Sequence, residues 1–306
     1  MTSLLNALQL IAPLLLVILV GVGLRKLGLA NDQWVMVLNN LAFYVAFPAL
    51  TFISLVDIDT TQLHGNLILD NAAALINDME IIKINKKIST HVRAASAIIL
   101  VATMFGNVAY LGYPLSEIAF GPSGLRLATI IGSIHVFVYF TIVVAVAEYQ
   151  TVRQLRLGQI GWRILRIPLV WAVVLGAVVA YLGVSPPTFA ATSFEILANA
   201  ATAVALLALG IFVAGLSLRG RMWVVALVTA LKLVVLPAIA WALAAPMQLE
   251  GQQRTVSILQ AAMPVGISTF AVADKLGMDR EVSASAILAT TVLSVLSLPV
   301  LLALLS

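Results

Sequence analysis

Long apolar runs separated by short polar stretches form the main pattern of hydrophobic and polar positions along the chain. The runs are continuously apolar and do not alternate with a period of two, so they predict helices and not the strands of a membrane barrel. A helix crosses the hydrocarbon core of a bilayer with roughly 20 apolar residues, and most runs reach that length. The pattern predicts ten spans, at residues 4–24, 33–56, 64–82, 94–119, 125–147, 164–182, 194–218, 222–245, 255–273 and 282–305.

Composition agrees with a chain that lies mostly in lipid. Of the 306 residues, 62% are hydrophobic and only 10% are charged, whereas soluble domains carry about 25% charged residues. No basic segment precedes the first apolar run, so we expect this helix to be retained and not cleaved as a signal peptide. The absence of cysteine excludes disulfides, thiolate metal ligands and cysteine nucleophiles.

The lysine and arginine residues gather in alternate loops of the predicted topology. Fourteen of the 17 fall on one side, which the positive-inside rule makes cytoplasmic. We therefore expect a multi-pass protein of the cell (inner) membrane with both termini on the non-cytoplasmic side. We attribute the net charge of +4 to these loops and not to nucleic-acid binding. The fourteen are Arg25, Lys26, Lys83, Lys86, Lys87, Arg93, Arg153, Arg156, Arg163, Arg166, Arg219, Arg221, Lys275 and Arg280.

The two halves of the chain contain similar glycine- and proline-rich segments, at 102–121 and 261–277. Gly121 and Gly277, near the ends of these segments, are 156 residues apart. Each half holds five predicted helices, and an odd number inserts the second half with the opposite orientation. The sequence thus predicts an all-α membrane protein of two inverted five-helix repeats, 1–150 and 151–306, an architecture common among secondary transporters.

Glycine, proline and small polar residues interrupt the predicted spans 94–119 and 255–273. Proline removes a backbone donor and glycine tolerates unwinding, and unpaired backbone groups in a membrane are tolerated only inside protein or beside a water-filled cavity. A kink or close packing would explain one such helix, whereas a matched pair favours a substrate site near the midplane, where half-helix N-termini suit anions. The residues are Gly106, Asn107, Gly112 and Pro114 in the first span and Pro264, Gly266, Ser268 and Thr269 in the second.

Four stretches of the chain resemble the auxin efflux carrier family, which includes bacterial malonate-type transporters and the plant PIN-FORMED carriers. Residues 38–52 (LNNLAFYVAFPALTF) are similar to the second helix of the family and 105–115 (FGNVAYLGYPL) to the fourth. Residues 206–212 (LLALGIF) are similar to the seventh, and 262–267 (AMPVGI), with the run on to residue 299, to the ninth and tenth. The match covers most of the chain except about residues 60–93.

The resemblance implies a ten-helix fold in which a scaffold and a transport domain are each drawn from both repeats. It also implies that broken helices 4 and 9 cross, with a carboxylate substrate near the crossing. The family's asparagines in helices 4 and 2 correspond to Asn107 and Asn39, and the small hydroxyl residue after the helix 2 proline corresponds to Thr51. Plant members have a proline at the position of Thr269, so the crossing here departs from theirs.

Two further polar residues lie inside the predicted spans. Lys232 comes five residues before Pro237 in the span 222–245. An intramembrane cation is costly and by default functional, yet this lysine is near enough to the cytoplasmic end to snorkel, and we favour structural pairing over substrate contact. Asn199 is the expected counterpart of Asn39 in the second half.

The third predicted span, 64–82, is unusually polar. It contains Asp70, Asp78 and Glu80, and an acid at the centre of a span costs about 2.5–3.5 kcal/mol on the insertion scale. The acids would couple H⁺ or Na⁺ if they faced a cavity, or the helix would be short and held by its neighbours. The favoured explanation is a local reading-frame error, because the composition changes abruptly at both ends and the family motifs resume after Arg93.

Together these features predict a secondary transporter that moves a small organic anion, such as a mono- or dicarboxylate, across the membrane by alternating access. The alternatives are a Na⁺-coupled symporter of the bile-acid type and a membrane receptor or assembly protein. An enzyme is not expected, because the chain lacks HExxH and GxSxG motifs. No metal or cofactor is expected besides a coupling H⁺ or Na⁺. The expected partners are the anion, the lipid bilayer and, as an alternative to a monomer, a second copy of the chain.

Overall fold

The computed structural model describes residues 4–56, 98–152 and 157–305. All regular elements in these ranges are helices, which confirms the all-α class. Five of the described helical segments are long and apolar enough to cross a membrane: Leu4–Lys26, Asp32–Val56, Thr188–Ala214, Met222–Ala244 and Arg280–Leu305. The polar span predicted at 64–82, with Asp70 and Asp78, lies outside the described residues, so its alternatives stay open. The ten-span inverted repeat also stays a prediction.

The described residues form two compact units. Unit 1 comprises the described parts of Met1–Ala12, Asn66–Val108 and Leu216–Ser306, and unit 2 those of Pro13–Gly65 and Ala109–Gly215. Each unit therefore takes chain from both the N-terminal and the C-terminal half. The repeat boundary predicted between residues 150 and 151 is a different division, which the units do not test.

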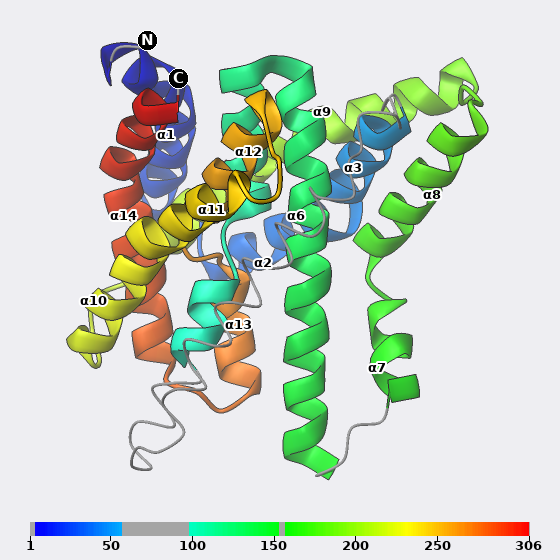
Figure 1. Cartoon of the computed structure of the whole chain (residues 1–306). Coiled ribbons are helices and arrows are strands. Elements are labelled where there is room, and N and C mark those ends of the chain that lie inside the picture. The colour runs from blue at the N-terminus through cyan, green and yellow to red at the C-terminus, as the bar shows by residue number, and fades with distance from the viewer. Residues whose placement is uncertain (1–3, 57–97, 153–156, 306) are drawn as a thin grey trace. The chain divides into compact units, whose positions relative to one another are not determined.

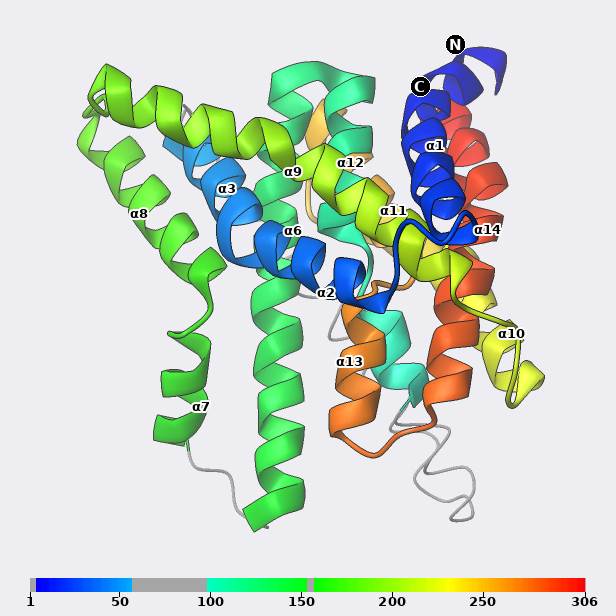
Figure 2. The same ribbon diagram turned by 180° about the vertical axis from the view of Figure 1, so that it is seen from behind.

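In unit 2, one long helical stretch packs against two others. α2 (Asp32–Leu41) continues through the π-helical turn η1 (Ala42–Ala46) into α3 (Phe47–Val56). α3 packs on α8 (Pro168–Leu182) and on α9 (Thr188–Ala214), and α2 packs on α9 (Figures 1 and 2). The rings of Phe52 and Phe194 lie 4.6 Å apart between α3 and α9, so aromatic packing holds this contact.

The remaining elements of unit 2 are α6 (Tyr113–Val152) and α7 (Leu157–Ile164), together with most of α1 (Leu4–Lys26), whose first residues belong to unit 1. α6 is kinked at Gly121, which has φ 69° and ψ −162°. Only glycine adopts this backbone conformation without strain. The kink falls in the loop that the sequence predicts between residues 119 and 125.

In unit 1, α10 (Met222–Ala230), the π-helical turn η5 (Leu231–Val235) and α11 (Leu236–Ala244) follow one another without a break. α14 (Arg280–Leu305) packs on α10 and on α13 (Ser268–Lys275), and α12 (Gly251–Ala261) packs on α11 (Figure 1). Buried Ala240, Ile258 and Ala261 form an apolar cluster where α11 meets α12. The segment between α12 and α13 therefore joins two helices that are each packed on another helix of the unit.

Two predicted helix starts are wrong. α9 begins at Thr188, directly after Pro186 and Pro187, and not at residue 194. Its first two turns include Thr188, Thr192 and Ser193, so a search for apolar runs misses them, while the prolines that cannot continue a helix mark the real boundary. The span predicted to start at residue 164 begins at Pro168, as α8, because Ile167 is extended and Pro168 takes the first position of the helix, while Ile164 is the last residue of α7.

Candidate functional site

Two non-helical segments of unit 1 pair with each other. Residues 105–107 follow a helical stretch at 98–104 and precede the π-helical turn η4 (Val108–Gly112), and residues 262–267 separate α12 from α13. Gly106 and Val265 form an antiparallel bridge. The backbone N–H of Asn107 donates to the carbonyl of Pro264 (2.7 Å), and that of Gly266 donates to the carbonyl of Phe105 (2.8 Å). We call this paired element the crossing. Each segment thus supplies hydrogen-bond partners for backbone N–H and C=O groups of the other. Away from water, these groups would otherwise be unpaired.

Space, and not backbone conformation, explains the two glycines of the crossing, because neither has a positive φ. A Cβ at Gly266 would lie 2.5 and 2.7 Å from ring atoms of Phe105 and 3.2 Å from the carbonyl oxygen of Gly106. A Cβ at Gly106 would lie 3.1 Å from Nζ and 3.4 Å from Cε of Lys232. The glycines thus let two backbones, an aromatic ring and an ammonium group approach one another.

Thr290 of α14 is hydrogen-bonded to the crossing. Its Oγ1 accepts a hydrogen bond from the backbone N–H of Val265 (3.1 Å) and donates to the carbonyl of Ala286 (2.7 Å). The side chain is fully buried. The hydroxyl therefore satisfies a backbone donor that the bridge with Gly106 does not.

We expect Thr290→Val to lower the free energy of unfolding by about 1–3 kcal/mol. Valine matches threonine in shape but cannot accept from the Val265 N–H, and a buried donor left without a partner costs about that much. Thermal unfolding in detergent measures the effect. Thr290→Ser, which keeps the hydroxyl, is the control and should fall between the two. Equal stability of the valine variant and the wild type would contradict this role.

Asn107 provides an unused hydrogen-bond donor at the crossing. The residue is 2% exposed, and its side-chain Nδ2 has no hydrogen-bond partner within the described part of the chain. Buried amides are nearly always hydrogen-bonded, so an orphaned donor calls for an explanation such as a ligand. Thr269, also buried, has an Oγ1 without a partner among the described residues. It sits in the first turn of α13, directly after Ser268.

Lys232 brings a positive charge to the same place. It lies in η5 and is 3% exposed. Its Nζ lies against Gly106, since a Cβ added to that glycine would come within 3.1 Å of it. The burial of the ammonium against the crossing argues against the snorkelling that the sequence leaves open.

Four other predicted site residues belong to unit 2. Asn39 of α2 accepts a hydrogen bond through Oδ1 from the hydroxyl of Tyr110 (3.1 Å). Thr51 of α3 is fully buried, and its Oγ1 has no partner in the described ranges. Pro114 is buried at the start of α6, and Asn199 is exposed on α9. These four therefore do not belong to the crossing as unit 1 builds it.

Three contacts escape sequence-based reasoning: the ring of Phe105 on Gly266, the hydroxyl of Thr290 on Val265, and Tyr110 on Asn39. Thr290 could have been suspected, because two adjacent hydroxyl residues, Thr290 and Thr291, stand between apolar stretches of the helix. Phe105 and Tyr110 belong to the motif at 105–115 but look like ordinary apolar positions.

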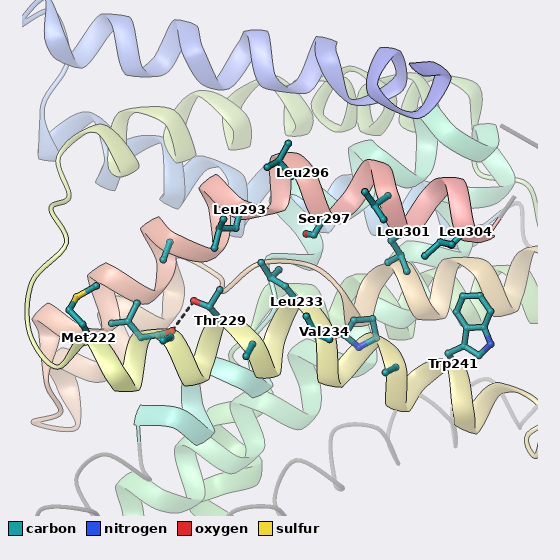
Figure 3. A pocket seen from close by; sticks show the side chains of 17 residues that line it. Met222, Thr229, Leu233, Val234, Trp241, Leu293, Leu296, Ser297, Leu301 and Leu304 are labelled. Atoms are coloured by element: carbon teal, nitrogen blue, oxygen red, sulfur yellow. Dashed lines mark hydrogen bonds between the residues drawn. The ribbon is translucent and has the colours of Figure 1, made fainter. Parts of the chain in front are cut away.

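An apolar groove also lies in unit 1, between α10–α11 and α14 (Figure 3). Its volume is about 980 Å³. No charged side chain of the described residues lines it, and its polar members include Thr229, whose hydroxyl donates within its own helix to the carbonyl of Val225. Many lining residues, among them Leu296 and Val234, are largely exposed. The groove suits hydrocarbon chains and contains none of the predicted site residues.

Comparisons with known proteins identify the family of this chain. The family model described as "Membrane transport protein" matches residues 6–302. An "Uncharacterized transporter" of Methanothermobacter thermautotrophicus is 25% identical and covers 94% of this chain and 95% of its own. One of Methanocaldococcus jannaschii is 23% identical, over 92% of this chain and 93% of its own. A protein of Rhizobium meliloti named "Putative malonate transporter" is 24% identical, over 84% and 83%. The apolar helices and the nearly complete family match make this chain a multi-pass membrane protein of the membrane transport protein family, the auxin efflux carrier family that its motifs resemble.

Proposed function

We propose that the protein is a secondary transporter that moves a small carboxylate across the cell membrane by alternating access. The observation that carries the proposal is the side-chain amide of Asn107, a buried donor without a partner among the described residues, held at a crossing of two non-helical segments. A carboxylate accepts hydrogen bonds only, so it complements a free N–H₂ group. No catalytic role is proposed for any residue.

The proposed architecture is ten spans in two inverted repeats, with broken crossing helices 4 and 9. Two features support it. The described chain falls into two compact units, each with segments from both halves, as expected when scaffold and transport domains both draw on both repeats. The start of α1 and the end of α14, which both belong to unit 1, lie at the same end of that unit (Figures 1 and 2). An even number of spans requires termini on one side, which the positive-inside rule makes the outside.

Malonate is the first substrate to test, because one relative is named "Putative malonate transporter". The coupling ion is H⁺ or Na⁺, or the carrier is driven by membrane potential alone. Within the described residues, no three His, Asp or Glu side chains cluster as a metal site. The crossing offers an amide, and the residues next to it offer hydroxyl and ammonium groups, which favours a uniporter or an H⁺-linked mechanism over a bile-acid-type Na⁺ symporter.

We expect Asn107→Ala to raise the KM for carboxylate uptake by about 10- to 100-fold, because a hydrogen bond to a charged group contributes about 1.5–3 kcal/mol. The measurement is uptake of labelled malonate and a panel of mono- and dicarboxylates into proteoliposomes, with and without Na⁺ and a pH gradient. Asn40→Ala is the matched control, since Asn40 is exposed on α2.

Three outcomes of this experiment are informative. Saturable uptake that is impaired in Asn107→Ala and intact in Asn40→Ala supports the proposal, and its dependence on the two gradients identifies the coupling ion. Uptake that requires Na⁺ favours the symporter alternative. A wild-type chain that carries no acid of the panel would refute the carrier proposal for these substrates and favour a receptor or assembly role.

A further inference from the structure

Building on the proposed function, we infer that Lys232 is the substrate-binding cation of the site: its ammonium group, seated against Gly106 of the crossing, pairs with the carboxylate that the Asn107 amide also holds. The position of Lys232 in the fold supports this role. The side chain comes from η5, a π-helical turn between α10 and α11, and is 3% exposed. π-Helical turns displace side chains from the regular helical register and occur frequently at functional sites.

The missing side chain of Gly106 makes room for the ammonium. Gly106 has no positive φ, so its backbone conformation does not require glycine. A Cβ there would come within 3.1 Å of Nζ and 3.4 Å of Cε of Lys232. The neighbouring residue in the chain is Asn107, whose Nδ2 is buried and lacks a partner in the described ranges. The positive charge of Lys232 thus lies against the residue that directly precedes the one carrying the unused donor.

The two groups have different tasks. The N–H₂ group of an amide can donate to any carbonyl or carboxylate oxygen, charged or neutral, whereas an ammonium group favours a negatively charged acceptor. Charge-assisted hydrogen bonds are roughly twice as strong as neutral ones. An ammonium also has three donors, so Lys232 can keep a protein partner and still donate to a substrate oxygen. Lys232 therefore provides the preference for an anion, and Asn107 the geometry.

The preference for malonate over its neutral diamide, malonamide, tests this assignment. We expect the wild type to bind malonate far more tightly than malonamide, measured by ligand-dependent thermal stabilisation in detergent and by inhibition of malonate counterflow in proteoliposomes. In Lys232→Met, which keeps the length of the side chain without its charge, malonate affinity should fall about 30-fold or more, and the preference should largely disappear.

A purely structural role for Lys232 leads to a different expected result. Loss of fold would weaken malonate and malonamide alike and would leave their ratio unchanged, so a preserved ratio in Lys232→Met overturns the assignment while leaving the carrier proposal intact. Failure of the wild type to bind or carry any carboxylate would instead overturn the carrier proposal, and the role of Lys232 with it.

A double-mutant cycle with Gly106 tests the contact itself. Gly106→Ala alone should weaken malonate binding about 10-fold, because the new Cβ pushes the ammonium away. In a Lys232→Ala background the same change should cost almost nothing, since the nearest remaining neighbour of the Cβ is then Cγ1 of Val108, at an ordinary contact distance of 3.4 Å. Equal effects of Gly106→Ala in both backgrounds would show that the ammonium does not act at the crossing.

Discussion

Replacing Gly266 by alanine is expected to abolish carboxylate uptake and to lower the free energy of unfolding by about 2–4 kcal/mol. The added Cβ would lie 2.5 and 2.7 Å from ring atoms of Phe105 and 3.2 Å from the carbonyl oxygen of Gly106. Real Cβ atoms do not approach that closely, so the ring or the backbone must move. Either movement strains the hydrogen bond from the Gly266 N–H to the Phe105 carbonyl, which joins the two segments of the crossing.

Gly106→Ala is the graded comparison for this change. Its Cβ would meet the flexible end of Lys232 at 3.1 Å, and not a ring or a backbone, so we expect weaker substrate binding with little loss of stability. Phe105→Leu added to Gly266→Ala should restore part of the stability by removing the clashing ring edge. Thermal unfolding and malonate uptake are measured side by side. Wild-type uptake by Gly266→Ala would show that the close approach is unimportant.

The glycines of the crossing are visible in the sequence, but their neighbours are not. Gly106 and Gly266 stand out because each lies within two residues of a polar residue or a proline inside an apolar run. Which side chain reaches a glycine depends on the rotation of each helix about its own axis. A helix that is apolar all round has no polar face to fix that rotation. The contacts of Phe105 with Gly266 and of Lys232 with Gly106 therefore could not be predicted from the sequence.

Lys232 shows most clearly which features of the site the sequence does not predict. Counting residues from Met222 places the lysine within reach of the membrane surface, so snorkelling is a reasonable interpretation of the sequence. The π-helical turn η5 could not be predicted from the apolar sequence around it, and the side chain is buried at the crossing. Asn107 is predictable as a site residue by its polarity, whereas the orphaned state of its amide is not.

The second large effect is expected at the contact of α1 with α9 in unit 2. A Cβ at Gly210 would collide with the carbonyl oxygen of Ile18 and lie 3.0 Å from the Cα of Gly21. A Cβ at Gly21 would lie 2.5 Å from the carbonyl oxygen of Leu207 and 3.0 Å from the Cα of Gly210. The two backbones thus touch through a pair of glycines, the packing that small residues permit between membrane helices.

We therefore expect Gly210→Ala to destabilise the fold by about 3 kcal/mol or more, because rigid backbone and not a flexible side chain opposes the new methyl group. Gly23→Ala is the matched control: it is in the same helix as Gly21, and a Cβ there would have no atom of the described residues within 4 Å. This control should be neutral or up to about 1 kcal/mol more stable, since alanine favours a helix over glycine. Thermal unfolding in detergent compares the two variants with the wild type. If both alanines changed stability equally, general helix propensity and not the close approach of α1 and α9 would determine the effect, and the glycine pair would lose its assigned role in holding unit 2 together.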